Sequence, residues 1–111
     1  MSKKQTIIDS YYQQILKDIA TLKTCANQLI YPSDDEIKDF LGSRIVKSDH
    51  FGGYHLQADR DFIVFYLDLN DFNKVRYHLI GRLLSYKNLR LWCYDSVYND
   101  AIKFLKASAN N

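Results

Sequence analysis

The stretch Phe62-Ile63-Val64-Phe65-Tyr66-Leu67-Asp68-Leu69 is the longest apolar run in the chain. β-branched and aromatic residues dominate it, and the polar clusters Asp59-Arg60-Asp61 and Asn70-Asp71 bound it. This length and composition are typical of a strand that is buried on both faces of a sheet. We therefore predict a central strand here, with most of the other segments covering it.

Two helices are predicted ahead of this strand. From about Thr6 to Ile30, apolar residues alternate spacings of three and four, which is the pattern of an amphipathic helix. We expect this helix to lie on the sheet, and a homodimer that forms through it as a coiled coil stays open. The apolar stripe consists of Ile8, Tyr12, Ile15, Ile19, Leu22, Ala26 and Leu29.

The second predicted helix begins after Pro32. Ser33 and Glu36 have the spacing of a capping box, and Gly42 is expected to end the helix. Its first turn, Asp34-Asp35-Glu36, is acidic, which complements the helix dipole and also suits a contact with a partner or a metal.

Three strands are predicted in succession in the middle of the chain. Arg44-Ile45-Val46-Lys47 and Tyr54-His55-Leu56-Gln57 flank the turn Phe51-Gly52-Gly53, and Asp59-Arg60-Asp61 makes the turn into the central strand. Strands this close in sequence form an antiparallel meander.

A helix, a strand and a last helix are predicted to follow. Apolar spacing over residues 72–86 indicates a helix capped by Asn70 or Asp71, and residues 89–94 read as a fourth strand. The last helix begins at Asp95 or Ser96.

The predicted fold is a single α+β domain that covers residues 1–111. It has a small single-layer antiparallel sheet of about four strands with helices packed against it, in the order α-α-β-β-β-α-β-α. Residues 107–111 are expected to fray at its end.

Composition bounds the class of protein. The chain has 111 residues, 47% of them hydrophobic, which is enough for one core. Its 15 basic and 13 acidic residues nearly balance, so nucleic acid, whose binding proteins usually carry a basic excess, is not the expected partner. We see no signal segment and no stretch of membrane-spanning length, and Cys25 and Cys93 form no CxxC motif. We expect a cytoplasmic protein with two free thiols.

No stretch matches a phosphate-binding loop, a metal-ligand spacing or a nucleophile elbow, so we predict no catalytic residues, no metal and no cofactor. The stretch Asp68-Leu69-Asn70-Asp71-Phe72-Asn73-Lys74-Val75 resembles the strand-end motif of GGDEF-class nucleotide cyclases, in which two acids one residue apart hold a divalent metal. Asp68 matches the first acid, but Asn70 replaces the second. One hard anionic ligand holds Mg²⁺ weakly, so a strand end that passes into a helix cap is the better interpretation.

Residues 49–86 resemble the sheet half of RelE/YafQ-type ribonuclease toxins, in which a Gly-containing turn precedes a strand and the last strand closes with His or Arg and an aromatic residue. The resemblance implies a histidine that acts as general acid or base on the RNA 2′-OH and an arginine that steadies phosphate charge. It requires residues 75–86 to form a strand, whereas their spacing favours a helix. The implied site residues are His50, His55, Asp61, Arg82 and Tyr86.

The chain is rich in aromatic residues, with nine Tyr, six Phe and one Trp. Tyr and Trp bury large areas at low entropic cost and are enriched in protein interfaces. Together with the acidic clusters, they predict a small non-enzymatic inhibitor of the immunity, antitoxin or anti-defence kind. It would mask a macromolecular partner such as a basic toxin or nuclease. The alternative is a RelE/YafQ-like ribonuclease toxin. The predicted partner surface consists of Tyr54, Trp92, Tyr94, Asp95, Tyr98, Asp34, Asp35 and Glu36.

Overall fold

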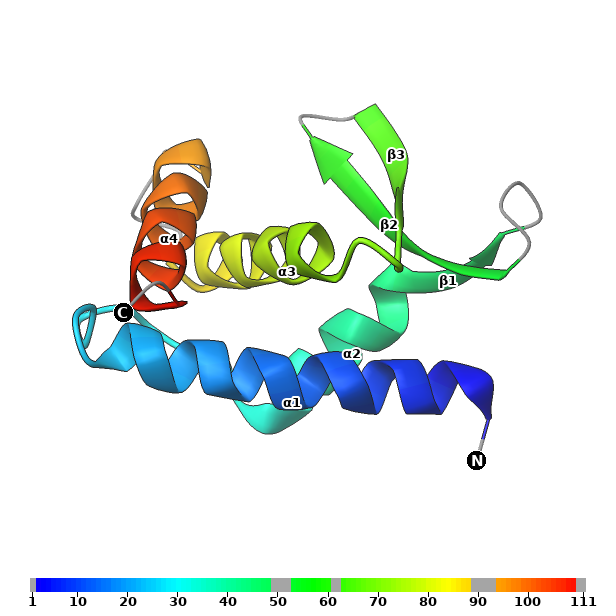
Figure 1. Cartoon of the computed structure of the whole chain (residues 1–111), viewed down its shortest axis with the longest axis horizontal. Helices are drawn as coiled ribbons and strands as arrows, with labels where there is room; N and C mark the ends of the chain where they lie inside the picture. Colours follow the sequence, from blue (N-terminus) through cyan, green and yellow to red (C-terminus); the bar gives the residue numbers. More distant parts are fainter. Residues whose placement is uncertain (1, 49–52, 61–62, 89–93, 110–111) are drawn as a thin grey trace.

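The computed structural model describes residues 2–48, 53–60, 63–88 and 94–109. Within these ranges, four helices and a three-stranded antiparallel sheet follow the order α-α-β-β-β-α-α, which confirms the predicted α+β class (Figure 1). Most of the predicted fourth strand, residues 89–94, lies outside the described residues, and Tyr94 is the first residue of a helix. The elements are α1 (Lys3–Lys23), α2 (Asp34–Arg44), β1 (Ile45–Ser48), β2 (Gly53–Arg60), β3 (Ile63–Asp68), α3 (Phe72–Lys87) and α4 (Tyr94–Ala109).

The sheet is the predicted antiparallel meander, in the spatial order β1-β2-β3. Leu56, in the middle strand, lies opposite Ile45 on one side and Leu67 on the other. Because side chains alternate between the two faces of a strand, these three residues share one face with Ala58. Ile45, Leu56 and Ala58 have no exposed surface (0%), so this is the face that meets the core.

The predicted place of residues 62–69 at the centre of the sheet, buried on both faces, is wrong. Among the described strands, β3 lies at the edge of the sheet, and in it Ile63 is 70% exposed, Val64 54% and Tyr66 41%, while Leu67 is buried. α3 reaches the β2–β3 hairpin as far as Phe65, whose ring packs edge-on to His78, and Asp59, whose carbonyl accepts from Arg82. Figure 1 shows the end of the hairpin beyond these residues extending away from α3.

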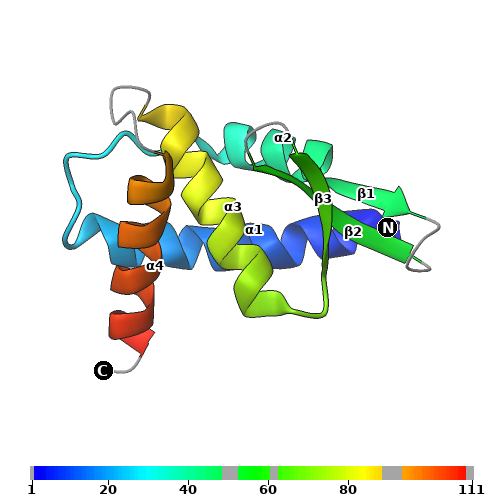
Figure 2. The same ribbon diagram turned by 90° about the horizontal axis from the view of Figure 1, so that it is seen from above.

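α1 keeps most of its predicted apolar face. Ile8, Ile15, Ile19 and Leu22 are buried, with Tyr11 as the buried ring in place of Tyr12. The helix ends at Lys23, well before the predicted end at Ile30, because the chain turns at Thr24, whose side chain and amide both bond to the carbonyl of Thr21. Instead of lying mainly on the sheet, α1 packs on α2, α3 and α4, so its stripe is used inside the domain (Figures 1 and 2).

α2 begins as predicted and ends later. Both bonds of the capping box between Ser33 and Glu36 are present. Gly42 does not end the helix, which continues to Arg44 and passes directly into β1 at Ile45. A glycine inside a helix costs only about 1 kcal/mol, which the burial of Leu41 and Ile37 on the same helix offsets.

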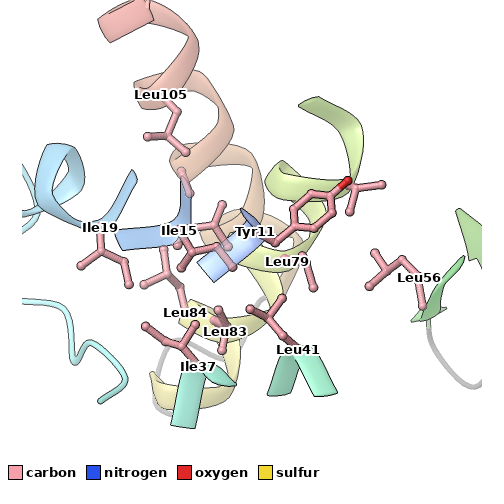
Figure 3. Close-up of a cluster of buried hydrophobic side chains, with 14 of the residues drawn as sticks. Tyr11, Ile15, Ile19, Ile37, Leu41, Leu56, Leu79, Leu83, Leu84 and Leu105 are labelled. Carbon is pink, nitrogen blue, oxygen red and sulfur yellow. The ribbon is translucent and has the colours of Figure 1, made fainter. Parts of the chain in front are cut away.

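The hydrophobic core lies between α1, α2 and α3, with side chains of α4 and the sheet closing it. Figure 3 shows Ile15 from α1, Ile37 and Leu41 from α2, and Leu79 and Leu84 from α3 converging there, all with 0% exposure. α4 adds Leu105 from its last turns and extends to Ala109, which takes in residues 107–109 of the predicted tail.

Asn88, just after α3, holds the connection between α1 and α2 in place. Its carboxamide oxygen accepts from the amide of Ile30 at 2.9 Å, and its Nδ2 donates to the carbonyls of Ile30 at 3.2 Å and Leu84 at 2.8 Å. A buried carboxamide that pairs with both backbone groups of one residue substitutes for a short piece of sheet, which fixes this irregular segment.

Candidate functional site

The predicted partner surface is only partly described. Trp92 lies outside the described residues, and for Tyr94 and Asp95 only the helical backbone at the start of α4 is described. The remaining five residues come from α2, β2 and α4.

Acids in the first turn of α2 make contacts that stabilise the fold. Glu36 closes the capping box and forms an ion pair with Lys87 of α3. Asp34 faces α1, where burial and then a hydrogen bond and the charge of Asp34 raise the pKa of Tyr12. Asp35 is exposed and also contributes to that shift. Contacts within the chain therefore explain two of the three acids, Glu36 and Asp34, without a protein partner.

The two described tyrosines of the predicted surface lie apart. Tyr98 is half-buried, and its ring packs edge-on to His78, with 6.3 Å between ring centroids, and against Gly81. Tyr54 is half-buried on β2 and lines a different region, beside α1. None of the three described cavities is lined by two of the five residues. The five described residues therefore come from three elements, and no described cavity brings two of them together.

The arrangement that a RelE/YafQ-like toxin would need does not form. Residues 72–87 are helix α3, as their spacing indicated, so there is no strand at 75–86. Arg82 donates to the carbonyl of Asp59 at 2.6 Å. Asp59 lies four residues along β2 from His55, and four residues of extended strand place their backbones about 13 Å apart. Tyr86 is 65% exposed on α3. His50 and Asp61 lie outside the described residues.

The strand end after β3 is a helix cap, as interpreted from sequence. Asp71 Oδ1 accepts from the amide of Lys74 at 3.4 Å, and Asp68 Oδ1 accepts from the amide of Asn70 at 2.9 Å. Asp71 rather than Asn70 is the cap of α3. Over the described part of the chain, no three His, Cys, Asp or Glu side chains are grouped as metal ligands.

The outer edge of β3 is the largest departure from the expected distribution of apolar residues. Val64 and Tyr66 point to the face of the sheet away from the core, and Ile63 lies beyond the part of the core face that the helices cover. Within the described ranges, β3 pairs with β2 alone, so its other side carries backbone groups that no described strand uses. Residues 61–73 around it contain three Asp and no Lys or Arg.

A polar cavity of about 470 Å³ lies between the first half of α1 and the end of the sheet where β2 begins and β3 ends. Its chemistry is mixed, with one ammonium group, one imidazole, one carboxylate and several hydroxyl groups. The side chains that matter for a ligand are those of Lys3, Ser10, Tyr54, His55, Asp68 and Phe72.

A second cavity, of about 290 Å³, is almost wholly apolar and lies under α4. Leu22, Leu29, Leu84 and Phe104 line it, and the free, exposed thiol of Cys25 is at its wall. Among the described residues that line it, Asp100 carries the only charged side chain that could orient a polar ligand.

The sequence did not predict the exposed edge of β3 or the polar cavity, and the reasons differ. Ile63, Val64 and Tyr66 belong to a run whose composition is that of a buried strand, and composition does not distinguish a middle strand from an edge strand. Lys3 and Asp68 are far apart in sequence, so only the fold brings them to one cavity.

No helix in the described ranges has the length and hydropathy needed to cross a membrane. Comparisons of the chain with protein-family models, with curated proteins and with solved structures find no match.

Proposed function

We propose that this protein is a small cytoplasmic inhibitor, of the immunity or antitoxin kind, that binds a basic protein partner through the outer edge of β3. The observation that carries the proposal is the exposure of Ile63, Val64 and Tyr66 on an edge strand. Scattered exposed apolar residues are ordinary, but three on one short strand, beside backbone groups that no described strand pairs with, mark an interaction surface.

Strand addition is the mode of binding that this edge favours. A partner strand would take up the outward backbone groups of β3, and its side chains would cover Val64 and Tyr66. The charge around the edge indicates what kind of partner fits. Asp68 and Asp71 are exposed at its end and residues 61–73 contain no Lys or Arg, so a basic partner is complementary to this end and associates faster. Arg60 of β2 lies opposite Ile63 at the other end.

The test compares two matched lysine substitutions in capture experiments with native host extract. Val64→Lys puts a charge on the proposed edge, whereas Ile30→Lys puts the same charge at a site that is 59% exposed and distant in sequence from β3. We expect the wild type and Ile30→Lys to retain the same basic protein stoichiometrically. Val64→Lys should bind it at least tenfold more weakly, about 1.4 kcal/mol. Equal retention by both variants, or no stoichiometric basic protein at all, would overturn the proposal.

Expression of the chain alone separates an inhibitor from a toxin. We expect growth to continue at the normal rate when the wild-type chain is expressed without its partner. Growth arrest that His55→Ala relieves would reject the inhibitor and favour a ribonuclease instead.

A further inference from the structure

The polar cavity is built from elements that meet only in the folded chain. Lys3 and Ser10 lie on one face of α1, two turns apart, and form one wall. His55 of β2 and Asp68 of β3, directly opposite each other in the sheet register, belong to the other wall. The cavity volume of about 470 Å³ falls within the range of roughly 300–1,000 Å³ that small-molecule sites occupy.

The two charged groups of the cavity have opposite signs and lie on opposite walls. Lys3 is exposed and supplies a cation for an anionic group. Asp68 is also exposed, and the amide of Asn70 holds one of its oxygens at 2.9 Å. A carboxylate has about four acceptor positions, so Asp68 still has acceptor capacity for hydroxyl donors. A ligand that satisfies both walls carries an anion at one end and hydroxyl groups at the other.

Aromatic rings complete the cavity. Tyr54 lines it from β2, and Phe72 lines it from the start of α3, where its ring is 37% exposed and stacks on Tyr11 with 5.0 Å between centroids and 19° between planes. An exposed ring that is held by a stacked neighbour offers a fixed flat surface at low entropic cost. Such a surface suits a planar ring of the ligand.

We propose that this cavity binds a nucleoside monophosphate. Lys3 and the hydroxyl group of Ser10 hold the phosphate, Asp68 accepts from the ribose hydroxyls, and the base lies against Phe72 or Tyr54. His55, buried at the wall with 4% exposure, gives the site a polar floor. The site shares Asp68 with the acidic end of β3, but Ile63, Val64 and Tyr66, which carry the proposal for protein binding, do not line it.

The test is isothermal titration of the full chain with adenosine 5′-monophosphate. We expect saturable binding that Lys3→Gln and Asp68→Asn each weaken about tenfold or more, while Lys17→Gln, an exposed lysine on the same helix that lines none of the described cavities, binds as the wild type does. Val64→Lys should also bind the nucleotide normally, so loss of partner capture and loss of nucleotide binding are separate results.

Two further ligands distinguish the chemical class. Adenosine and inorganic phosphate should each bind at least tenfold more weakly than the nucleotide, since each satisfies one wall only. Phosphate that binds as tightly as the nucleotide would reduce the cavity to an anion site and overturn the proposal. Absence of nucleotide binding at millimolar concentration, or binding that neither Lys3→Gln nor Asp68→Asn weakens, would also overturn it. Circular dichroism of each variant checks that it is folded.

Discussion

Tyr11 is the residue in which burial, hydrogen bonding and charge act together most clearly. Its side chain is 3% exposed, and its hydroxyl donates to the carbonyl of Leu69 at 2.9 Å. Burial, with smaller effects of the charges on Asp68 and Asp71, raises the pKa of Tyr11 to about 12. Ionisation of this phenol would leave a buried anion close to two carboxylates, so the fold favours the neutral form.

This raised pKa makes stability dependent on alkaline pH. An unfolded tyrosine ionises near pH 10, so the contribution of Tyr11 is complete below that pH and is lost as the pH rises towards 12. The loss amounts to about 2 kcal/mol. We expect the free energy of unfolding in urea to fall between pH 9.5 and about 11.5.

Tyr11→Phe should be less stable at pH 8, but its free energy of unfolding should fall less over that interval. Any slope that remains in this variant reports Tyr12 and Tyr31, whose pKa values burial also raises. The same slope in both proteins would contradict the assignment to Tyr11.

The Asp18–Arg76 ion pair connects α1 to α3. Arg76 Nε donates to Asp18 Oδ2 at 3.1 Å and Nη2 donates to Oδ1 at 3.0 Å, and the two side chains are 4% and 15% exposed. The position of Asp18 on the buried side of α1 follows from helical spacing after Tyr11 and Ile15, but its charge argues for the surface. Sequence alone could not resolve that conflict, because the arginine that neutralises Asp18 comes from a distant helix.

Asp18→Ala should destabilise the protein by about 3–5 kcal/mol, because Arg76 would stay buried without its counter-ion. Asp9→Ala on the same helix removes only an exposed bond from Gln5 and should cost well under 1 kcal/mol. The free energy of unfolding in urea measures both. In the double variant Asp18→Ala/Arg76→Ala, the loss should be smaller than the sum of the single losses. An Asp18→Ala variant as stable as Asp9→Ala would show that the pair contributes little.

At the scale of elements, the contact between α3 and α4 depends on a missing side chain. An ideal Cβ on Gly81 would lie 2.7 Å from Cγ of Tyr98 and closer still to Cδ2. These atoms are at the base of the ring, so the ring cannot swing away without moving α4. In sequence terms a glycine only weakens its helix, and the contact with Tyr98 of α4 gives the physical reason for Gly81.

A Gly→Ala change inside a helix usually stabilises a protein by about 1 kcal/mol. Gly81→Ala should instead destabilise this protein, because the added Cβ would collide with Tyr98. Overpacking of this kind typically costs about 1–3 kcal/mol. Gly42→Ala is the matched control, because a Cβ on that helical glycine meets nothing within 4 Å, and it should be neutral or stabilising. Thermal unfolding of the two variants gives the comparison. If Gly81→Ala raised the melting temperature as much as Gly42→Ala, the close packing of α3 on α4 would be refuted.

β3 shows which kind of information a local sequence lacks. The existence and type of most elements followed from periodicity and caps, including the Ser33 capping box and the helix predicted over residues 72–86, which extends to Lys87 in the structure. The position of β3 in the sheet did not, because an apolar run has the same composition whether helices cover it or another molecule does. Only the register of β2 and β3 and the extent of helix coverage decided it.

For the molecule as a whole, the proposed class of function follows from what the sequence lacks, and the residues predicted for the partner surface follow from local clustering. The predicted residues were chosen because Tyr, Trp and acids cluster in the chain, yet Tyr98 packs against Gly81 and Glu36 caps a helix. The β3 edge and the polar cavity depend on long-range placement. Glu36 and Asp34 contact Lys87 of α3 and Tyr12 of α1, whereas the exposed apolar residues of β3 had no local signal in the sequence.

The position of Lys3 at the rim of the polar cavity has a practical consequence for handling the protein. Any peptide fused ahead of α1 would emerge beside that cavity and compete with whatever enters it. α4 ends at the opposite end of the molecule in both ribbon views (Figures 1 and 2). Affinity tags and fluorescent fusions therefore belong after α4, where they leave the cavity mouth clear.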